Sequence, residues 1–196
     1  MKYRLISLFL ILISIIPVYS QWGIKGGLNG DWIKPHFYSN PRLGFHLGVT
    51  YDFLLSDKLY LQPGLLFTTL GKNRETAFNP SAEQGKGFIE IYALEAPLQL
   101  SFRPPIGKQA NFVLDIGLYV RQGLFGRDHM TYNSENTIKK SPFNQFNRSD
   151  VGFNIGAGFL FNRIYTGLIY QQGLTDAEKD GSSQHTSFRL SLGYKL

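Results

Sequence analysis

Three residues within one short stretch have the types and spacing for acid–base chemistry, namely His46, Thr50 and Asp52. All three share one parity, so in a β-strand their side chains would point to the same face. A histidine near a hydroxyl and a carboxylate could serve a lipid-modifying enzyme. The same residue types also make up the polar face of an ordinary two-faced strand, and we favour this interpretation. We therefore expect these residues to be structural and the protein not to be an enzyme.

Metal, thiol and nucleotide chemistry are not indicated. The four histidines show no His-x-x-x-His or Glu-x-x-His spacing, which would be expected of a metal site. The absence of cysteine excludes a disulfide framework, a thiolate nucleophile and a cysteine-ligated metal. The glycines between residues 23 and 27 are not followed by a helical pattern, so they do not indicate a phosphate loop. We expect no cofactor.

A larger set of polar side chains could act together. It contains charges of both signs in similar number and consists of Lys25, His46, Asp52, Glu95, Arg103, Asp115, Arg121, Asp150, Arg189 and Lys195. Such a set could line a pore or bind a small ligand. Its members could instead neutralise one another, because a buried charge needs a partner. The choice depends on the elements that position these side chains.

Those elements are predicted to be β-strands. In the last segment Phe188, Leu190, Leu192, Tyr194 and Leu196 take one parity, while polar or small residues take the other. Similar alternation, with abundant glycine and no convincing helical period, predicts eight strands at residues 22–29, 43–53, 59–70, 88–102, 110–122, 149–161, 164–173 and 186–196. An unpaired terminal strand would invite aggregation. The last strand is therefore predicted to pair with the first and close an all-β, antiparallel, up-and-down barrel.

The connections between the predicted strands alternate in length. Long connections at residues 30–42, 71–87, 126–148 and 174–185 alternate with short ones at 54–57, 104–107 and 162–163. Outer-membrane barrels have long external loops and short periplasmic turns, and an even strand count then places both termini in the periplasm. Pro63 and Pro97 fall inside predicted strands. Because proline cannot donate a ladder hydrogen bond, each predicts a bulge or a local break of the ladder.

The apolar face is predicted to point outward, into lipid. Charge is nearly absent from that parity, with Glu90 as the main exception, and aromatic residues lie toward the strand ends, as interface girdles require. The polar parity has many glycines and few of the lysines and glutamates that a solvated outer surface carries. A soluble, lipocalin-like barrel with the apolar face inside is the alternative. The transmembrane arrangement is favoured, and because backbone groups in lipid must bond internally, such a sheet must close.

Residues 1–20 are typical of a secretory signal peptide. Lys2 and Arg4 precede an apolar run, and Val18, Tyr19 and Ser20 form an acceptable cleavage site. A membrane anchor helix is less well supported, because spanning takes about 20 apolar residues and polar sequence resumes at Gln21. The barrel domain is therefore predicted to cover residues 21–196. Loss of the leader lowers the formal net charge from +6 to +4, and without a block of basic residues this charge does not indicate a nucleic-acid partner.

Three segments resemble a known family. They are Gly-Ile-Lys-Gly-Gly-Leu-Asn at 23–29, Leu-Gln-Pro-Gly-Leu-Leu-Phe at 61–67 followed by Gly71-Lys72, and Leu-Glu-Ala-Pro-Leu-Gln-Leu at 94–100. Over the whole mature chain the sequence resembles the PorT-like outer-membrane β-barrel family of Bacteroidetes, often labelled the porin family. The resemblance implies an outer-membrane location, and the two prolines belong to the family pattern. It carries no catalytic signature.

These observations lead to an expected function. Eight strands leave an interior that side chains just fill, so the polar set is predicted to plug the lumen as an ion-pair network. The function is then structural or interaction-based, with outer-membrane lipid around the wall. The 126–148 loop combines basic and aromatic residues and could bind a protein or anionic lipopolysaccharide, although the composition of an ordinary external loop is similar. A small-solute porin and a lipid-modifying enzyme are the alternatives.

Overall fold

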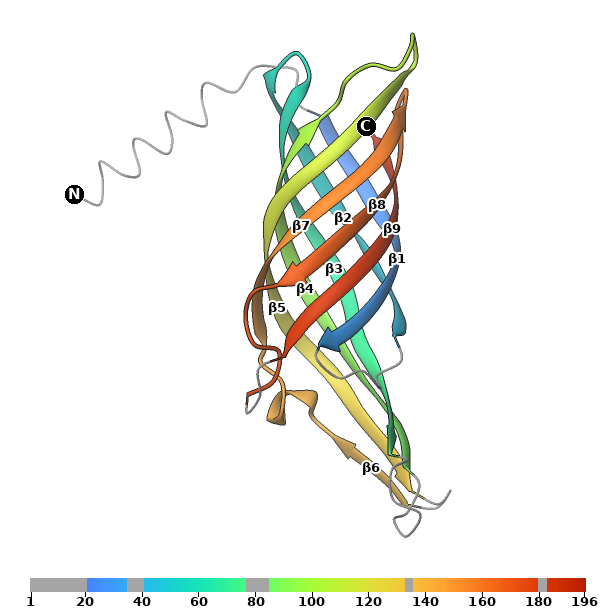
Figure 1. Ribbon diagram of the computed structural model, residues 1–196, viewed down its shortest axis with the longest axis vertical. Helices are drawn as coiled ribbons and strands as arrows, with labels where there is room; N and C mark the ends of the chain where they lie inside the picture. The colour runs from blue at the N-terminus through green and yellow to red at the C-terminus, as the bar shows by residue number, and fades with distance from the viewer. Residues whose placement is uncertain (1–20, 35–40, 77–84, 133–135, 180–182) are drawn as a thin grey trace, which may run out of the picture.

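The computed structural model describes residues 21–34, 41–76, 85–132, 136–179 and 183–196. The predicted signal peptide at 1–20 lies outside the described residues. Among the described residues no helix has both the length and the apolar character needed to cross a membrane. Nearly all of the described chain is β-strand (Figure 1).

Eight strands form a closed antiparallel barrel, which confirms the predicted fold. They are β1 (Gln21–Lys34), β2 (Arg42–Ser56), β3 (Leu59–Thr76), β4 (Gly85–Phe102), β5 (Ala110–Tyr132), β7 (Ser149–Phe161), β8 (Ile164–Gly173) and β9 (Gln184–Lys195). Each strand pairs with its sequence neighbour in the barrel, and β9 pairs with β1 from Gly23 opposite Lys195 to Lys34 opposite Gln184. The predicted closure of the last strand onto the first is therefore confirmed.

The two faces of the wall are as the alternation predicts. Outward residues such as Leu47, Leu118 and Leu192 are 57%, 59% and 61% exposed, although all three are apolar. Inward residues such as Glu95 and Ser191 are fully buried, at 0% exposure. A soluble barrel would bury the apolar parity instead, so this exposure pattern contradicts the lipocalin-like alternative.

Exposed aromatic rings form two rows on the outer wall. Near the short turns, Trp22 contacts Tyr51 at a centroid distance of 4.9 Å, and Phe112 contacts Phe159 at 5.5 Å. Toward the long loops, a second row includes Phe45, Phe67, Tyr92, Phe125, Phe153, Tyr170 and Phe188. Two aromatic rows on either side of an apolar band are typical of the girdles of outer-membrane barrels.

Several strands are longer than the alternation predicts, including β1, which continues to Lys34 into the expected loop at 30–42. β3, β4 and β5 continue beyond their neighbours at the long-loop end, so much of the expected loops at 71–87 and 126–148 is strand (Figure 1). A short strand, β6 (Asn136–Lys140), pairs back onto β5, and the 3₁₀ helix η1 (Pro142–Asn144) follows it. A bulge at Leu124 shifts the register of β5 against β4. This bulge inverts the parity along β5, and a strict period of two does not continue through it.

The two strand prolines break the ladder without shifting it. Pairing of β2 with β3 is interrupted between the pairs Thr50–Gly64 and Phe53–Leu61, on either side of Pro63. Pairing of β3 with β4 is interrupted between Pro63–Leu98 and Leu66–Glu95, which brackets Pro97. The register is the same before and after each interruption. Of the two predicted alternatives, a bulge or a local break of the ladder, the structure shows the break at both prolines.

Candidate functional sites in the lumen and at the two mouths

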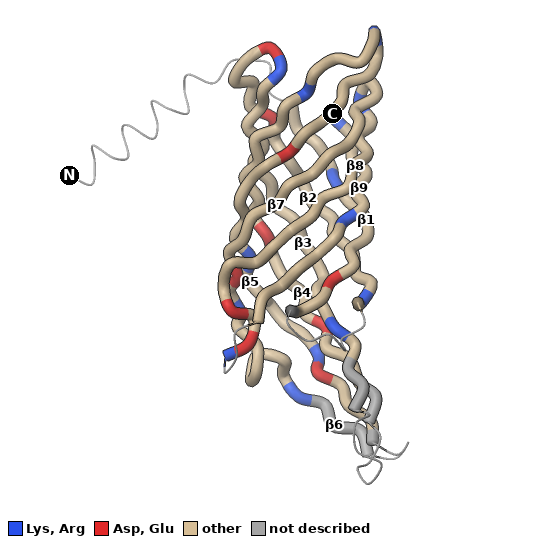
Figure 2. The backbone as a smooth tube through the Cα atoms, viewed as in Figure 1, with Lys and Arg blue, Asp and Glu red and all other residues tan. Residues whose placement is uncertain are grey.

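All ten polar residues singled out from the sequence lie inside the barrel, and none is more than 7% exposed. Figure 2 shows that basic and acidic positions are distributed along the whole length of the wall. Most of the ten belong to two ion-pair clusters, one centred on Glu95 and one on Asp52. Lys25, Asp115 and His46 lie outside these ion pairs.

Glu95 is the centre of the cluster nearer the long loops. Its carboxylate accepts hydrogen bonds from both Arg121 and Arg189, with shortest distances of 2.7 Å each, and from Gln171 at 3.0 Å. Arg121 also donates to Asp150 at 3.2 Å. Because β4 and β5 place Glu95 directly opposite Arg121, their pairing follows from the register.

Asp52 is the centre of the second cluster, near the short turns. Arg103 donates to both of its oxygens, at 2.6 and 3.1 Å, and Gln62 and Lys195 each donate one further hydrogen bond. The Arg103 guanidinium also lies 4.3 Å from the ring centroid of Tyr60. Bidentate geometry of this kind fixes the orientation of the arginine as well as its charge.

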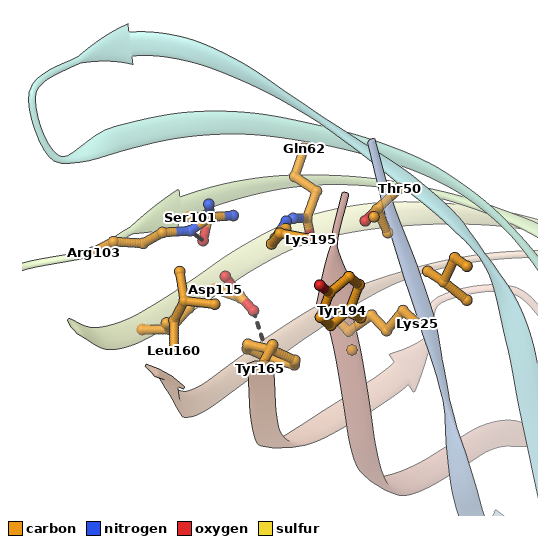
Figure 3. Close-up of a pocket in the computed structure, with 14 residues that line it drawn as sticks. Lys25, Thr50, Gln62, Ser101, Arg103, Asp115, Leu160, Tyr165, Tyr194 and Lys195 are labelled. Carbon is orange, nitrogen blue, oxygen red and sulfur yellow. Dashed lines mark hydrogen bonds between the residues drawn. The ribbon is translucent and has the colours of Figure 1, made fainter. Parts of the chain in front are cut away.

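Asp115 is not ion-paired with Arg103, which its inward parity on the neighbouring predicted strand makes a possible partner. The register places Ser101 opposite Asp115 and Glu95 opposite Arg121. Among the described residues Asp115 instead accepts a hydrogen bond from the hydroxyl of Tyr165 at 3.2 Å (Figure 3). The ring of Tyr165 in turn lies 4.7 Å from the ammonium of Lys25.

The structure does not assemble His46, Thr50 and Asp52 into an acid–base group. The His46 ring forms hydrogen bonds with Asn29 at 2.7 Å and Ser191 at 2.9 Å. The Asp52 carboxylate instead accepts hydrogen bonds from Arg103 and the other donors of its cluster. In the described part of the chain no group of three or more His, Cys, Asp or Glu side chains could hold a metal ion.

Very little free space is left between these side chains. Two cavities inside the barrel have volumes of about 10 Å³ each, one beside Asp115 and Tyr165 (Figure 3) and one beside His46 and Glu95. A cavity of this size holds about one water molecule. The lumen is therefore filled by side chains around both the Asp52 cluster and the Glu95 cluster.

Several further polar residues complete this filling and were left out of the polar set of ten. They are neutral, lie in predicted strands and include Asn29, Thr68, Tyr119, Asn154, Gln171 and Ser191. Their inward parity was the signal that could have identified them. Asp31 was expected in a loop but lies in β1, 2% exposed, and its carboxylate oxygens have no hydrogen-bond partner among the described residues.

An apolar cap closes the mouth at the long-loop end. Phe143 and Phe146 of the β6–β7 connection pack there with inward residues of the strands, and the cluster consists of Ile33, Leu70, Ile89, Ile91, Ala93, Phe143, Phe146 and Ala177. The β8–β9 connection holds the cap in place, because the Lys179 ammonium donates to the Phe143 carbonyl at 2.8 Å. The second half of the 126–148 segment is therefore part of the barrel mouth and not a free external loop.

Outside this cap, the long hairpin forms an open recess of about 610 Å³. Phe88 and His129 stack there with ring centroids 5.3 Å apart, and Arg127 and Lys140 are exposed at its rim. Among the described residues neither Arg127 nor Lys140 has an ion-pair partner within 4.0 Å. The recess thus combines an aromatic surface with two cations, and among the described residues of its lining Asp128 is the one acid.

Comparison with known families gives the identity of the fold. A family described as "Outer membrane protein beta-barrel domain" matches residues 17–178. The chain belongs to this family. The protein is therefore an outer-membrane β-barrel, and the apolar wall between two aromatic rows agrees with that location. No curated protein relative matches the chain.

Solved structures similar to this outer-membrane barrel include three small barrels. The outer membrane enzyme PagL shares 11% identity, with 90% of this chain and 99% of that chain covered and a TM-score of 0.51. Ail, the attachment invasion locus protein of Yersinia pestis, shares 15% identity with the same coverage and a TM-score of 0.45. Neisserial surface protein A shares 9% identity, with 89% and 97% covered and a TM-score of 0.49. At these identities the likeness concerns the fold alone.

Proposed function

We propose that this outer-membrane barrel binds an anionic glycolipid or a similar anionic surface through its long hairpin, and that it is neither a channel nor an enzyme. The observation that carries the proposal is the recess in which Arg127 and Lys140 flank the stacked rings of Phe88 and His129. Exposed cations beside an aromatic surface suit phosphate groups attached to sugar rings. Lipopolysaccharide presents this combination on the external face of the membrane.

The orientation of the barrel is part of the proposal. The apolar band contacts membrane lipid, the long hairpins are external, and the short turns and both chain ends are periplasmic, as loop lengths in such barrels suggest. In that orientation the recess is just outside Tyr92 and Phe125 of the aromatic row. This is the level at which lipid head groups meet water. Assignment to the PorT-like group, which rests on the sequence segments alone, also belongs to this proposal.

A channel role receives less support from the geometry. The lumen contains cavities of only about 10 Å³, and the apolar cap covers its long-loop mouth. An enzyme role receives less support because His46 and Asp52 are engaged in separate hydrogen-bond groups. Planar-bilayer recordings on the purified protein test the first point, since a steady ion current would favour the porin alternative. Analysis of membrane lipids in a deletion strain tests the second.

The binding proposal is tested by titrating the purified barrel with lipopolysaccharide and with its dephosphorylated form. We expect saturable binding of the phosphorylated form only. The double variant Arg127→Gln/Lys140→Gln should weaken binding by about tenfold or more, because it removes two charge-assisted contacts. A matched control, Lys58→Gln/Arg163→Gln, removes two exposed cations at the opposite end and should bind like the parent. Equal affinity of the two double variants would refute the proposal.

A further inference from the structure

The mouth at the short-turn end contains a second, unrelated feature. A polar cavity of about 310 Å³ opens there. It is lined by residues at the strand ends near the short turns, among them two buried cations, Arg103 and Lys195. Each of these cations is only 7% exposed. A cavity of this volume is at the lower end of the range for small-molecule sites.

The hydrogen-bond arrangement leaves cationic donors unused at this cavity. Asp52 accepts four hydrogen bonds, from Gln62, twice from Arg103 and from Lys195, so both of its oxygens are saturated. Arg103 uses its third nitrogen on Ser101 at 3.0 Å. Of the five guanidinium and three ammonium N–H groups that these side chains carry, two on each have no partner among the described residues.

The local charge is also not balanced. The charged residues that line this cavity and the small one next to it are Lys25, Arg103 and Lys195 on the positive side and Asp52 and Asp115 on the negative side. One positive charge therefore remains in a mostly buried position. Figure 3 shows Arg103, Lys195 and Asp115 around the smaller of the two cavities. A buried excess charge is costly unless a counter-ion is available.

The cavity walls indicate what kind of anion would fit. Arg103 is preoriented by the ring of Tyr60, and Asn111 lines the cavity beside it. Leu54 and Leu160 supply apolar wall. We propose that this mouth is a binding site for a small carboxylate with a short apolar chain, whose oxygens take the free N–H groups of Arg103 and Lys195.

The test is calorimetric titration of the purified, folded barrel with butyrate. At about 0.15 M sodium chloride, where charge effects are screened beyond roughly 8 Å, we expect saturable one-to-one binding with a dissociation constant near the millimolar range, given the few atoms of the ligand. Neutral butyramide has the same size but no charge and should not bind measurably. Lack of saturable butyrate binding, or equal binding of butyramide, would overturn the assignment.

Variants locate the site. Lys195→Gln removes the charge and leaves a side chain one atom shorter that still carries an N–H donor, and it should weaken butyrate binding by about tenfold or more. Lys58→Gln, at an exposed position of the same end, is the matched control and should bind normally. Leu54→Trp narrows the cavity while leaving every charge in place, so it should weaken binding by about tenfold or more, and it decides the question even where Lys195→Gln does not fold. Parent-like binding by Leu54→Trp would exclude this cavity as the site.

Discussion

Replacement of Glu95 by glutamine should strongly destabilise the barrel. Glu95 is fully buried and accepts five hydrogen bonds, two from Arg121, two from Arg189 and one from Gln171. In Glu95→Gln, Arg121 still has Asp150. Arg189 loses its charged partner and keeps its contact with Thr68, at 3.3 Å, while the glutamine carbonyl can still accept a neutral hydrogen bond. One buried guanidinium is thus left without an anion, which costs about 3–5 kcal/mol.

Asp115→Asn is the matched comparison, because it also neutralises a buried acid on the inner face. Asp115 has no ion pair among the described residues, and asparagine can still accept the hydrogen bond of Tyr165. Its cost should be that of one weakened hydrogen bond, about 1 kcal/mol. Urea unfolding in lipid vesicles, followed by the fluorescence of Trp22 and Trp32, gives both free energies of unfolding.

A double variant separates charge from packing. Arg189→Met removes the unpaired cation and keeps most of the side-chain volume. The double variant Glu95→Gln/Arg189→Met should therefore recover a large part of the stability lost in Glu95→Gln. Replacement of a whole buried ion pair by apolar residues is often neutral or stabilising in other proteins. If Glu95→Gln and Asp115→Asn had equal free energies of unfolding, or if the double variant were less stable than Glu95→Gln, the ion-pair reasoning would be refuted.

Three other predictions concern the wall, the orientation and the mouth. Leu47→Arg and Leu114→Arg, both on the exposed apolar face, should each cost about 2–4 kcal/mol of unfolding free energy in vesicles, and parent-like stability of both would contradict lipid contact. A cysteine at Ser141 should react with an impermeant thiol reagent on intact cells and one at Ser56 should not; the reverse pattern would invert the proposed topology. Phe146→Ala should destabilise the protein by about 3–5 kcal/mol without producing current in planar bilayers, and a steady current would mean that the polar filling alone does not close the lumen.

The barrel could be predicted from the sequence because most wall strands follow a period of two over most of their length. In β9 every second residue from Phe188 to Leu196 is apolar, and in the structure these are the exposed positions. The same period identified the inward polar residues. It could not identify their partners, because those depend on the register between strands, which is a property of the closed sheet. Asp115 illustrates this limit, since Ser101 and not an arginine is its cross-strand neighbour.

The long-loop end was harder to predict for a different reason. Beyond the aromatic row the inward face changes from polar to apolar at Ile89 and Ile91 of β4, which the cap covers. A pattern that assigns apolar residues to the outside reads these two positions as irregular, although the predicted strand at 88–102 includes both. The predicted fifth strand ends at residue 122, just before the bulge at Leu124, beyond which the alternation changes parity. Pro142 and Phe143 turn the following connection back into the mouth, and this tertiary packing leaves no periodic signal.

The two closures of this barrel rest on different physics, and this difference bears on its function. The lumen is filled by ion pairs such as Glu95 with Arg189, which weaken if an acid is protonated. The cap is held mainly by burial of rings such as Phe146, which is 0% exposed, with the Lys72 ammonium 5.0 Å from that ring and Lys179 bonded to the Phe143 carbonyl. Protonation of Glu95 would loosen the ion pairs of the lumen without removing the apolar contacts of the cap. A path for solutes would require both closures to move. The presence of two separate closures supports a function at the two mouths of the barrel. It argues against a function in transport along the lumen.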